Sequence, residues 1–254
     1  MNFKNKVVLI TGASTGIGKE LVVTLSKTNC KIILVARRVE LLENLISEIS
    51  NESNAEFLTL KCDVSKKEEV AEAYVQSINK FGRIDVAILN AGFGEKMKVE
   101  EYNSELAETT FGANVFGIVY WVEQLIPEFI KRRRGYIIGI SSLADSRGFS
   151  GSGFYCASKA AASIYLEGLR VELIEHNIKV ITVKPGFVKT PMTDKNDYAM
   201  PLIMETDKAV DIILKGIEKE KRIIQFPFPI VLGIKIISLL PNWLYEFLAS
   251  KKFI

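Results

Sequence analysis

Cysteine and histidine are scarce in this chain of 254 residues. The three cysteines, Cys30, Cys62 and Cys156, are an odd number and show no C-x-x-C spacing, which argues against a disulfide framework and against a zinc knuckle. The single histidine, His176, has no cluster of ligating residues beside it. No metal site is therefore predicted, and the sparse cysteines favour a reducing, cytoplasmic environment.

Long apolar runs and a large charge surplus are also absent. The first six residues are too polar for a signal peptide, and no apolar stretch reaches the roughly 20 residues that a transmembrane helix needs. The net charge of +3 is too small for nucleic-acid binding, so no such partner is expected. Residues 1–218 hold 27 Lys and Arg against 28 Asp and Glu, and residues 219–254 hold 6 against 2. The surplus therefore lies in the C-terminal tail.

The sequence does contain short apolar runs that alternate with helical patterns. The runs suit strands buried on both faces of a parallel sheet, and they lie at residues 7–10, 32–35, 57–60, 86–89, 136–140 and 180–183, with 222–226 as a further candidate. Helical spacing of apolar residues occurs at residues 17–28, 39–50, 66–80, 114–134 and 155–176. This alternation predicts a three-layer, doubly wound α/β fold around a central parallel sheet of about seven strands. We expect one domain over residues 1–254, with a core at 1–222 and an apolar, basic and helical C-terminal extension at 223–254.

A glycine-rich turn follows the first predicted strand. It reads Thr11-Gly-Ala-Ser-Thr-Gly-Ile-Gly18 and opens the first predicted helix. Glycines there permit a tight turn and a close approach of the backbone to a pyrophosphate, while the helix N-terminus presents free N–H groups to the phosphates. The position of the motif between strand and helix predicts a dinucleotide site that includes Gly12, Ser14, Thr15, Gly16, Ile17 and Gly18.

Two arginines at the end of the second predicted strand favour NADPH over NADH. A site for NAD typically has a carboxylate there, which accepts hydrogen bonds from the ribose 2′-OH. This sequence has Arg37 and Arg38 instead, and a guanidinium can bind a 2′-phosphate in bidentate fashion. The hydroxyl of Ser14 could add to this site. The alternative is that both arginines simply begin a solvated helix.

Tyr155 and Lys159 are four residues apart on a predicted helix and therefore share one face. A tyrosine with a pKa of about 10 is a poor acid–base catalyst at neutral pH. A nearby ammonium stabilises the phenolate and lowers that pKa, which makes proton transfer easier. Ser141 and Ser142 follow the fifth predicted strand, at the edge where α/β sheets bind their ligands.

With these motifs the chain resembles the short-chain dehydrogenase/reductase family, from Lys6 to about Gly216. The other matching residues are Cys62-Asp-Val64, Asn90-Ala-Gly92, Asn114, Ile140-Ser-Ser142, Pro185-Gly186 and Thr190. The resemblance implies a Rossmann-type fold and an NAD(P)-dependent oxidoreductase. It also implies a homodimer through the helices at 114–134 and 155–176.

The resemblance implies a role for each matching residue. Tyr155 is expected to donate the proton, Ser142 to polarise the substrate, Lys159 to hold the nicotinamide ribose and lower the tyrosine pKa, and Asn114 to support a water-linked proton path. For the cofactor, Asp63 and Val64 are expected at the adenine and Asn90, Ala91 and Gly92 at the ribose. Pro185, Gly186, Val188 and Thr190 are expected at the nicotinamide end.

The C-terminal extension departs from the family pattern. Many family members finish with a strand that closes in a Gly-Gly pair, whereas this chain continues with apolar stretches at 230–240 and 242–254 that are separated by Pro241. Three interpretations remain open: a cover over the substrate cleft, a peripheral membrane contact through residues 230–254, and a dimer contact.

We expect an NADPH-dependent reductase that acts on a hydrophobic ketone or aldehyde. The substrate class rests on residues 190–206, a predicted lid whose apolar side chains are Met192, Met200, Leu202, Ile203 and Met204. One alternative is an alcohol dehydrogenase that works mainly in the oxidative direction. The other is a cofactor-sensing protein without turnover, which is disfavoured because Asn114, Ser142, Tyr155 and Lys159 are all present.

Overall fold

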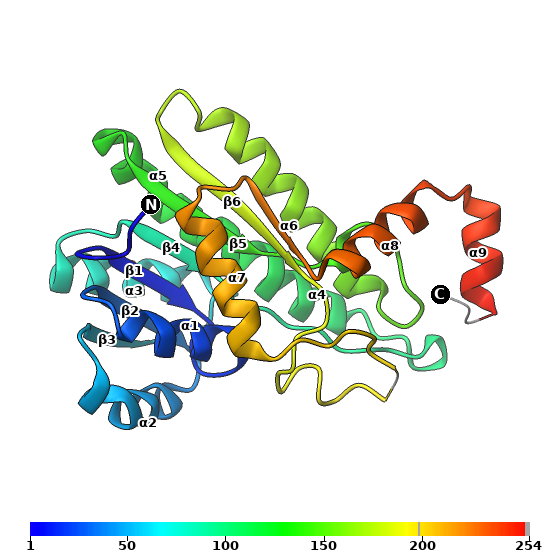
Figure 1. Ribbon diagram of the computed structural model, residues 1–254, viewed down its shortest axis with the longest axis horizontal. Helices are drawn as coiled ribbons and strands as arrows, with labels where there is room; N and C mark the ends of the chain where they lie inside the picture. The colour runs from blue at the N-terminus through cyan, green and yellow to red at the C-terminus, as the bar shows by residue number, and fades with distance from the viewer. Residues whose placement is uncertain (198, 252–254) are drawn as a thin grey trace.

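The computed structural model describes residues 1–197 and 199–251 and contains a seven-stranded parallel sheet with helices on both faces (Figure 1). The strand order is β3-β2-β1-β4-β5-β6-β7. The strands are β1 (Val7–Thr11), β2 (Lys31–Ala36), β3 (Glu56–Lys61), β4 (Val86–Leu89), β5 (Gly135–Ile140), β6 (Ile178–Pro185) and β7 (Ile223–Phe226). The predicted doubly wound α/β fold with about seven parallel strands is confirmed.

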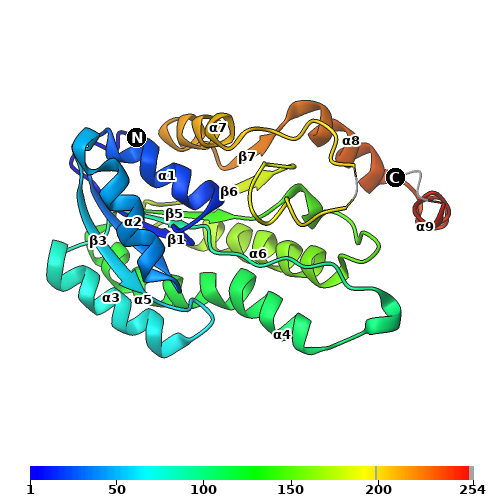
Figure 2. The same cartoon turned by 90° about the horizontal axis from the view of Figure 1, so that it is seen from below.

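The helices form the two outer layers (Figure 2). One face of the sheet is covered by α1 (Gly16–Ser26), α2 (Val39–Ile49) and α7 (Thr206–Glu218). The other is covered by α3 (Lys67–Phe81), α5 (Gly117–Arg132) and α6 (Gly153–Glu172), and α4 (Glu105–Phe111) packs against α6. The extension adds α8 (Phe228–Leu239) and α9 (Asn242–Ser250) beyond the sheet.

Strand β1 shows why the apolar runs form strands at the centre of the molecule. All five of its residues are buried. Val8 and Ile10 pack into the core beneath α1, α2 and α7, whereas Val7 and Leu9 pack into the core beneath α3, α5 and α6. Both faces of this strand are covered by helices, so the side chains on both faces are apolar. Such a strand appears in the sequence as a continuous apolar run, as is usual in parallel sheets.

The strand order reverses between β1 and β4, and this reversal determines where the ligand-binding crevice lies. Strand β1 pairs with β2 on one side and with β4 on the other, parallel in both cases. The loops that leave the carboxyl ends of β1 and β4 therefore run to opposite faces of the sheet and leave a crevice between them. Ligands of open α/β sheets bind at such a crevice.

Two helices and one irregular turn differ from the sequence-based expectation. The predicted helix at 114–134 is preceded by α4, and a π-helical turn, Gly112–Phe116, joins α4 to α5. Helix α4 buries only Thr110, so it has no apolar stripe from which it could be predicted. Helix α7 does have one, with Ala209, Val210, Ile213 and Ile217 buried, and the prediction overlooked it.

The extension beyond the sheet begins at Pro227, because residues 223–226 form the last strand. Helix α8 buries only Val231 and α9 only Tyr245. Among the helices of residues 1–197 and 199–251, none is long and apolar enough to cross a membrane. Residue 198 of the predicted lid, and residues 252–254 of the extension, lie outside the described residues.

Candidate active site

The glycine turn between β1 and α1 has a conformation that other residues would not tolerate. Gly12 and Gly16 have φ angles of +66° and +55°, in the left-handed region that favours glycine. A Cβ atom at Gly18 would lie 2.1 Å from the carbonyl oxygen of Gly12. The turn therefore leaves its backbone exposed at the start of α1, as a bound pyrophosphate requires.

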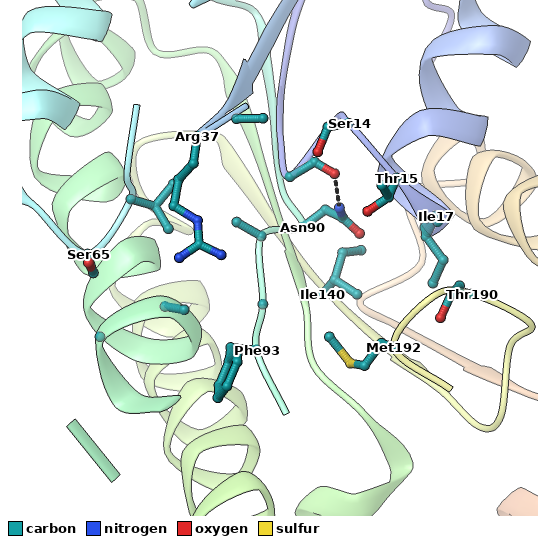
Figure 3. A pocket seen from close by; sticks show the side chains of 18 of the residues that line it. Ser14, Thr15, Ile17, Arg37, Ser65, Asn90, Phe93, Ile140, Thr190 and Met192 are labelled. Atoms are coloured by element: carbon teal, nitrogen blue, oxygen red, sulfur yellow. Dashed lines mark hydrogen bonds between the residues drawn. The ribbon is translucent and has the colours of Figure 1, made fainter. Parts of the chain in front are cut away.

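A cavity of about 800 Å³ lies beside this turn at the carboxyl ends of the strands (Figure 3). Arg37 lines one end of the cavity, and Thr190 and Met192 line the other. The predicted cofactor and catalytic residues that line it are Gly12, Ser14, Thr15, Gly16, Ile17, Arg37, Arg38, Asp63, Val64, Asn90, Ala91, Gly92, Ser142, Tyr155, Lys159, Pro185, Gly186, Val188 and Thr190. The predicted residues Gly18 and Asn114 are not among those that line the cavity. Its volume and glycine cradle fit a dinucleotide.

Arg37 and Arg38 enter the cavity from the end of β2. Both side chains are exposed, and Figure 3 shows the guanidinium of Arg37 directed into the cavity. Within residues 1–197 and 199–251 neither arginine has an acidic side chain at ion-pair distance. Their charges are therefore available to an anionic ligand.

Asp63 and Asn90 belong to the loops that follow β3 and β4. The Asp63 carboxylate accepts hydrogen bonds from the backbone N–H and the hydroxyl of Ser65, at 3.0 and 2.8 Å. The Asn90 side-chain amide donates to the carbonyl oxygens of Thr11 and Gly12, at 3.0 and 3.3 Å. Asn90 thus ties the loop after β4 to the glycine turn.

Helix α6 brings Tyr155 and Lys159 to the cavity wall. The Lys159 ammonium lies 5.7 Å from the centre of the Tyr155 ring and donates a hydrogen bond to the carbonyl oxygen of Ile140, at 3.0 Å. Ser142 follows β5, and its Oγ accepts a hydrogen bond from the backbone N–H of Ala144 at 3.1 Å. The end of β5 and the first turns of α6 therefore bring all three side chains to one cavity.

Burial changes the acidity of Lys159. Its side chain is buried, and the loss of hydration lowers its pKa from 10.5 to about 8, while the negative charge of Asp145 opposes the decrease. The ammonium is therefore the main form at neutral pH, but it begins to lose its proton only slightly above that pH.

Asn114 lies in the π-helical turn and is completely buried. Its Oδ1 accepts from the backbone N–H of Phe93 at 2.7 Å, and its Nδ2 donates to the carbonyl oxygen of Phe93 at 2.8 Å and to Ser158 Oγ at 2.9 Å. Asn114 therefore holds the segment after β4 against α6. Irregular π-helical turns of this kind occur frequently at functional sites.

Several residues that line the cavity had no signal in the sequence. Glu108 and Thr109 come from the unpredicted helix α4, and Ser65, Lys66 and Phe93 come from loops. Of the apolar residues predicted for the lid, Met192 lines the cavity, whereas Leu202 and Ile203 are exposed and Met204 packs against the core.

The extension is attached to the loop between Ser142 and Tyr155. The Arg147 guanidinium donates to Asn242 Oδ1 at 3.0 Å and to the carbonyl oxygens of Ser238 and Leu240, and it lies 4.7 Å from the centre of the Tyr245 ring. Tyr245 in turn donates to the carbonyl oxygen of Gly148 at 2.7 Å. No residue of 227–251 is among those that line the cavity.

Comparisons with known proteins show which family the chain belongs to. A family model described as short chain dehydrogenase matches residues 6–200. An oxidoreductase of Myxococcus xanthus, described as uncharacterized, is 31% identical over 97% of both chains. A similarly described oxidoreductase of Staphylococcus saprophyticus is 39% identical over 76% of this chain and 78% of that protein. A solved short-chain dehydrogenase from Sphingobium yanoikuyae, described in complex with NADPH, has a TM-score of 0.81 at 25% identity and covers 93% of this chain and 97% of its own.

The family model spans both the glycine turn and the Tyr155–Lys159 pair. The family model and the solved structure indicate the same family as the sequence motifs and the fold do. The chain is therefore an enzyme of the short-chain dehydrogenase family, an oxidoreductase that binds NAD(P).

Proposed function

We propose that the protein is an NADPH-dependent reductase that converts a hydrophobic ketone or aldehyde to an alcohol. The observation that carries the proposal is that Ser142, Tyr155 and Lys159 line the same cavity as the glycine turn and Arg37. One cavity thus offers groups for binding a dinucleotide, for polarising a carbonyl and for donating a proton.

Tyr155 is the proton donor in this reaction. NADPH, when bound, supplies the hydride. Tyr155 Oη donates a proton to the carbonyl oxygen as negative charge develops there, and the Lys159 ammonium favours the phenolate that remains. Ser142 Oγ accepts its one observed hydrogen bond from Ala144, so its own proton can be donated to the same carbonyl oxygen. We assign Asn114 to the water-linked path that returns a proton through Lys159.

The other cavity residues hold the cofactor. We assign the glycine turn, Gly12 to Gly18, to the pyrophosphate and Asp63 with Val64 to the adenine. We assign Asn90, Ala91 and Gly92 to the ribose, and Tyr155 and Lys159 to the hydroxyls of the nicotinamide ribose. We assign Pro185, Gly186, Val188 and Thr190 to the nicotinamide. All these residues except Ala13 and Gly18 line the cavity, and Gly18 lies so close to the carbonyl oxygen of Gly12 that a side chain there would disturb the turn.

NADPH is proposed over NADH because of the charges at the end of β2. Arg37 and Arg38 line the cavity together with Lys66, and no carboxylate follows β2. A 2′-phosphate would find favourable charges there, whereas the ribose 2′-OH of NADH would lack its usual carboxylate acceptor.

The apolar residues on the substrate side support a hydrophobic carbonyl compound. Phe93, Ile140 and Met192 line the cavity, and Figure 3 shows Phe93 and Met192 on either side of its open part. A methionine adapts to ligands of different shape. A ketone or aldehyde with an apolar body therefore suits this end of the cavity better than a small charged one.

We also propose a cytoplasmic homodimer with a peripheral membrane contact. The cysteines are free and buried, which suits a reducing compartment. Ile164 and Val171 are seven residues apart on α6 and 70% and 66% exposed, so α6 presents an apolar face that a second copy could cover. The exposed apolar side chains of α8 and α9, with the basic surplus of the tail, suit the surface of an anionic membrane.

The test of the reaction is Tyr155→Phe, with Tyr165→Phe on the same helix as the control. NADPH oxidation with a panel of apolar ketones and aldehydes should fall by about 10²–10⁴-fold in Tyr155→Phe, while NADPH still binds with only the modest loss of affinity expected from one missing ribose contact. Retained turnover would refute the role of Tyr155. Tight NADPH binding without turnover of any carbonyl or alcohol by the wild type would instead support the cofactor-sensing alternative.

A further inference from the structure

Asp145 is a buried carboxylate for which the proposed reaction has no role. It ends the short 3₁₀ turn Leu143–Asp145 that follows Ser142, and its side chain is 3% exposed. A buried carboxylate is costly unless it is paired and hydrogen-bonded. Asp145 is both: Oδ2 lies 2.6 Å from Lys184 Nζ on β6 and accepts from Ser163 Oγ at 2.5 Å, and Oδ1 accepts from Ser146 Oγ at 3.1 Å.

These contacts connect Asp145 to the backbone of the catalytic helix. Ser163 Oγ on α6 is 2.8 Å from Ser141 Oγ, and Ser141 donates to the carbonyl oxygen of Lys159 at 3.0 Å. Ser141 and Ser163 are themselves buried. The ion pair and the two serines thus form one buried polar cluster between β5, β6 and α6, directly behind Lys159.

We propose that Asp145, paired with Lys184, is a positioning residue that acts on the reaction through the Lys159 ammonium. The inference rests on the proposed function, because the ammonium matters to turnover only if Lys159 assists Tyr155. The negative charge of Asp145 favours the protonated form of Lys159. It does so from behind the cavity, without touching substrate or cofactor.

Asp145 is the charged group that raises the pKa of Lys159, and its partner Lys184 partly offsets that effect by neutralising its charge. From β5 the Lys159 ammonium meets the carbonyl oxygen of Ile140, and from its own helix it meets the ring of Tyr155. A Cβ atom at Gly92 would lie 3.1 Å from Asn114 Oδ1 and 3.3 Å from Lys159 Nζ, so neutral groups face it there too. Among the described residues, Asp145 is the charged neighbour that opposes the effect of burial on the Lys159 pKa.

Lys184 gives the proposal a sharp test, because the two members of the pair affect Lys159 in opposite directions. Asp145→Asn removes the negative charge and leaves the positive one, so the pKa of Lys159 should fall below its value of about 8, by about one unit. Lys184→Met leaves the carboxylate unneutralised, so the same pKa should rise. A purely structural role predicts the same direction of effect for both variants, since both break the same ion pair.

The pKa of Lys159 is measured directly by NMR titration of the full chain with ¹³C-labelled lysine. Its resonance is assigned by its absence in Lys159→Met. The exposed pair Lys215–Asp211 on α7, whose atoms are also 2.6 Å apart, provides the matched control: Asp211→Asn and Lys215→Met should leave the titration of Lys159 unchanged. The alkaline limb of kcat/KM for carbonyl reduction should move in the same direction as the titration in each variant.

Two outcomes overturn the proposal: no shift in either variant, or a shift in the same direction in both. If Asp145→Asn alone does not fold, the double variant Asp145→Asn with Lys184→Met replaces it, because neither charge of the pair is then left unpaired. The pKa of Lys159 in the double variant should be lower than its pKa in Lys184→Met alone. Failure of the proposed function is distinguishable, because it would abolish turnover in the wild type while the opposite shifts in the lysine titration persist.

Discussion

A Cβ atom added at Gly94 would lie 2.7 Å from Cδ2 of the Tyr155 ring. Contacts between real Cβ atoms and their neighbours are not this short, so the backbone after β4 packs directly against the ring of Tyr155. Gly94 is the feature that allows the chain to pass at this distance.

Replacing this glycine should impair catalysis. Gly94→Ala displaces the Tyr155 ring or the segment that covers it, and kcat should fall by about 10-fold or more because small misplacements of a reacting group are costly. NADPH affinity should change little. Steady-state kinetics and NADPH titration provide the measurement. Gly153→Ala is the control, because its Cβ would meet nothing within 4 Å; equal kcat values for the two variants would contradict the prediction.

The cofactor preference should depend on Arg37. Arg37→Ala removes a charge-assisted contact to the 2′-phosphate, so the Kd of NADPH should rise by about 10- to 100-fold. The Kd of NADH should stay within about twofold, since NADH has no phosphate there. Fluorescence titrations compare the two. Arg134→Ala, at the amino end of β5, should change neither, and tight NADH binding by the wild type would show that Arg37 does not select the cofactor.

Lys159 should make stability depend on pH. Burial lowers its pKa from 10.5 to about 8, so between these values the unfolded chain binds a proton that the folded chain does not. Raising the pH through this window therefore favours the folded state. The unfolding free energy of the wild type relative to Lys159→Met should increase by about 3 kcal/mol from pH 7 to pH 10.5.

Urea unfolding of both proteins across this pH range measures the difference. Below pH 8 the full cost of burying the ammonium is present, so Lys159→Met should be the more stable protein there while being inactive. Parallel pH curves for the two proteins would show that the ammonium is not buried at this cost.

The extension should bind anionic membranes through its exposed apolar side chains. Phe228 and Trp243 are 75% and 71% exposed, and aromatic residues with nearby lysines suit the membrane interface. The wild type should float with vesicles of phosphatidylcholine and phosphatidylglycerol but not with phosphatidylcholine alone, and added salt should weaken binding.

The variant for this test is Trp243→Glu, which should abolish flotation. Val99→Glu is the control, because Val99 is an exposed apolar residue outside the extension. If the wild type does not float and instead dimerises through the extension in sedimentation experiments, the dimer interpretation replaces the membrane contact.

Local patterns allowed much of the fold and the site to be predicted. The apolar strands could be identified because each is buried on both faces, as Val7 to Ile10 show. Tyr155 and Lys159 could be paired because helical spacing alone puts them on one face. Arg37 could be placed in the cavity because it immediately follows a strand.

Other features depended on contacts between distant segments. Glu108 reaches the cavity from a helix with only one buried residue, so its position depends on tertiary packing. Asp145 looked like an ordinary loop residue, because its partner Lys184 belongs to a strand on the other side of α6 in the sequence. Arg147 holds the extension largely through backbone carbonyl oxygens, and such contacts leave no pattern in the side chains.

The hydrogen bonds that Arg147 makes to the extension have a consequence for synthesis on the ribosome. Its partners Ser238, Leu240 and Asn242 come 91, 93 and 95 residues later in the chain. At translation rates of about 5–20 residues per second, they are made about 5–20 s after Arg147. The loop beside Tyr155 therefore acquires this anchor only after the last strand of the sheet, β7, and most of α8 have been synthesised.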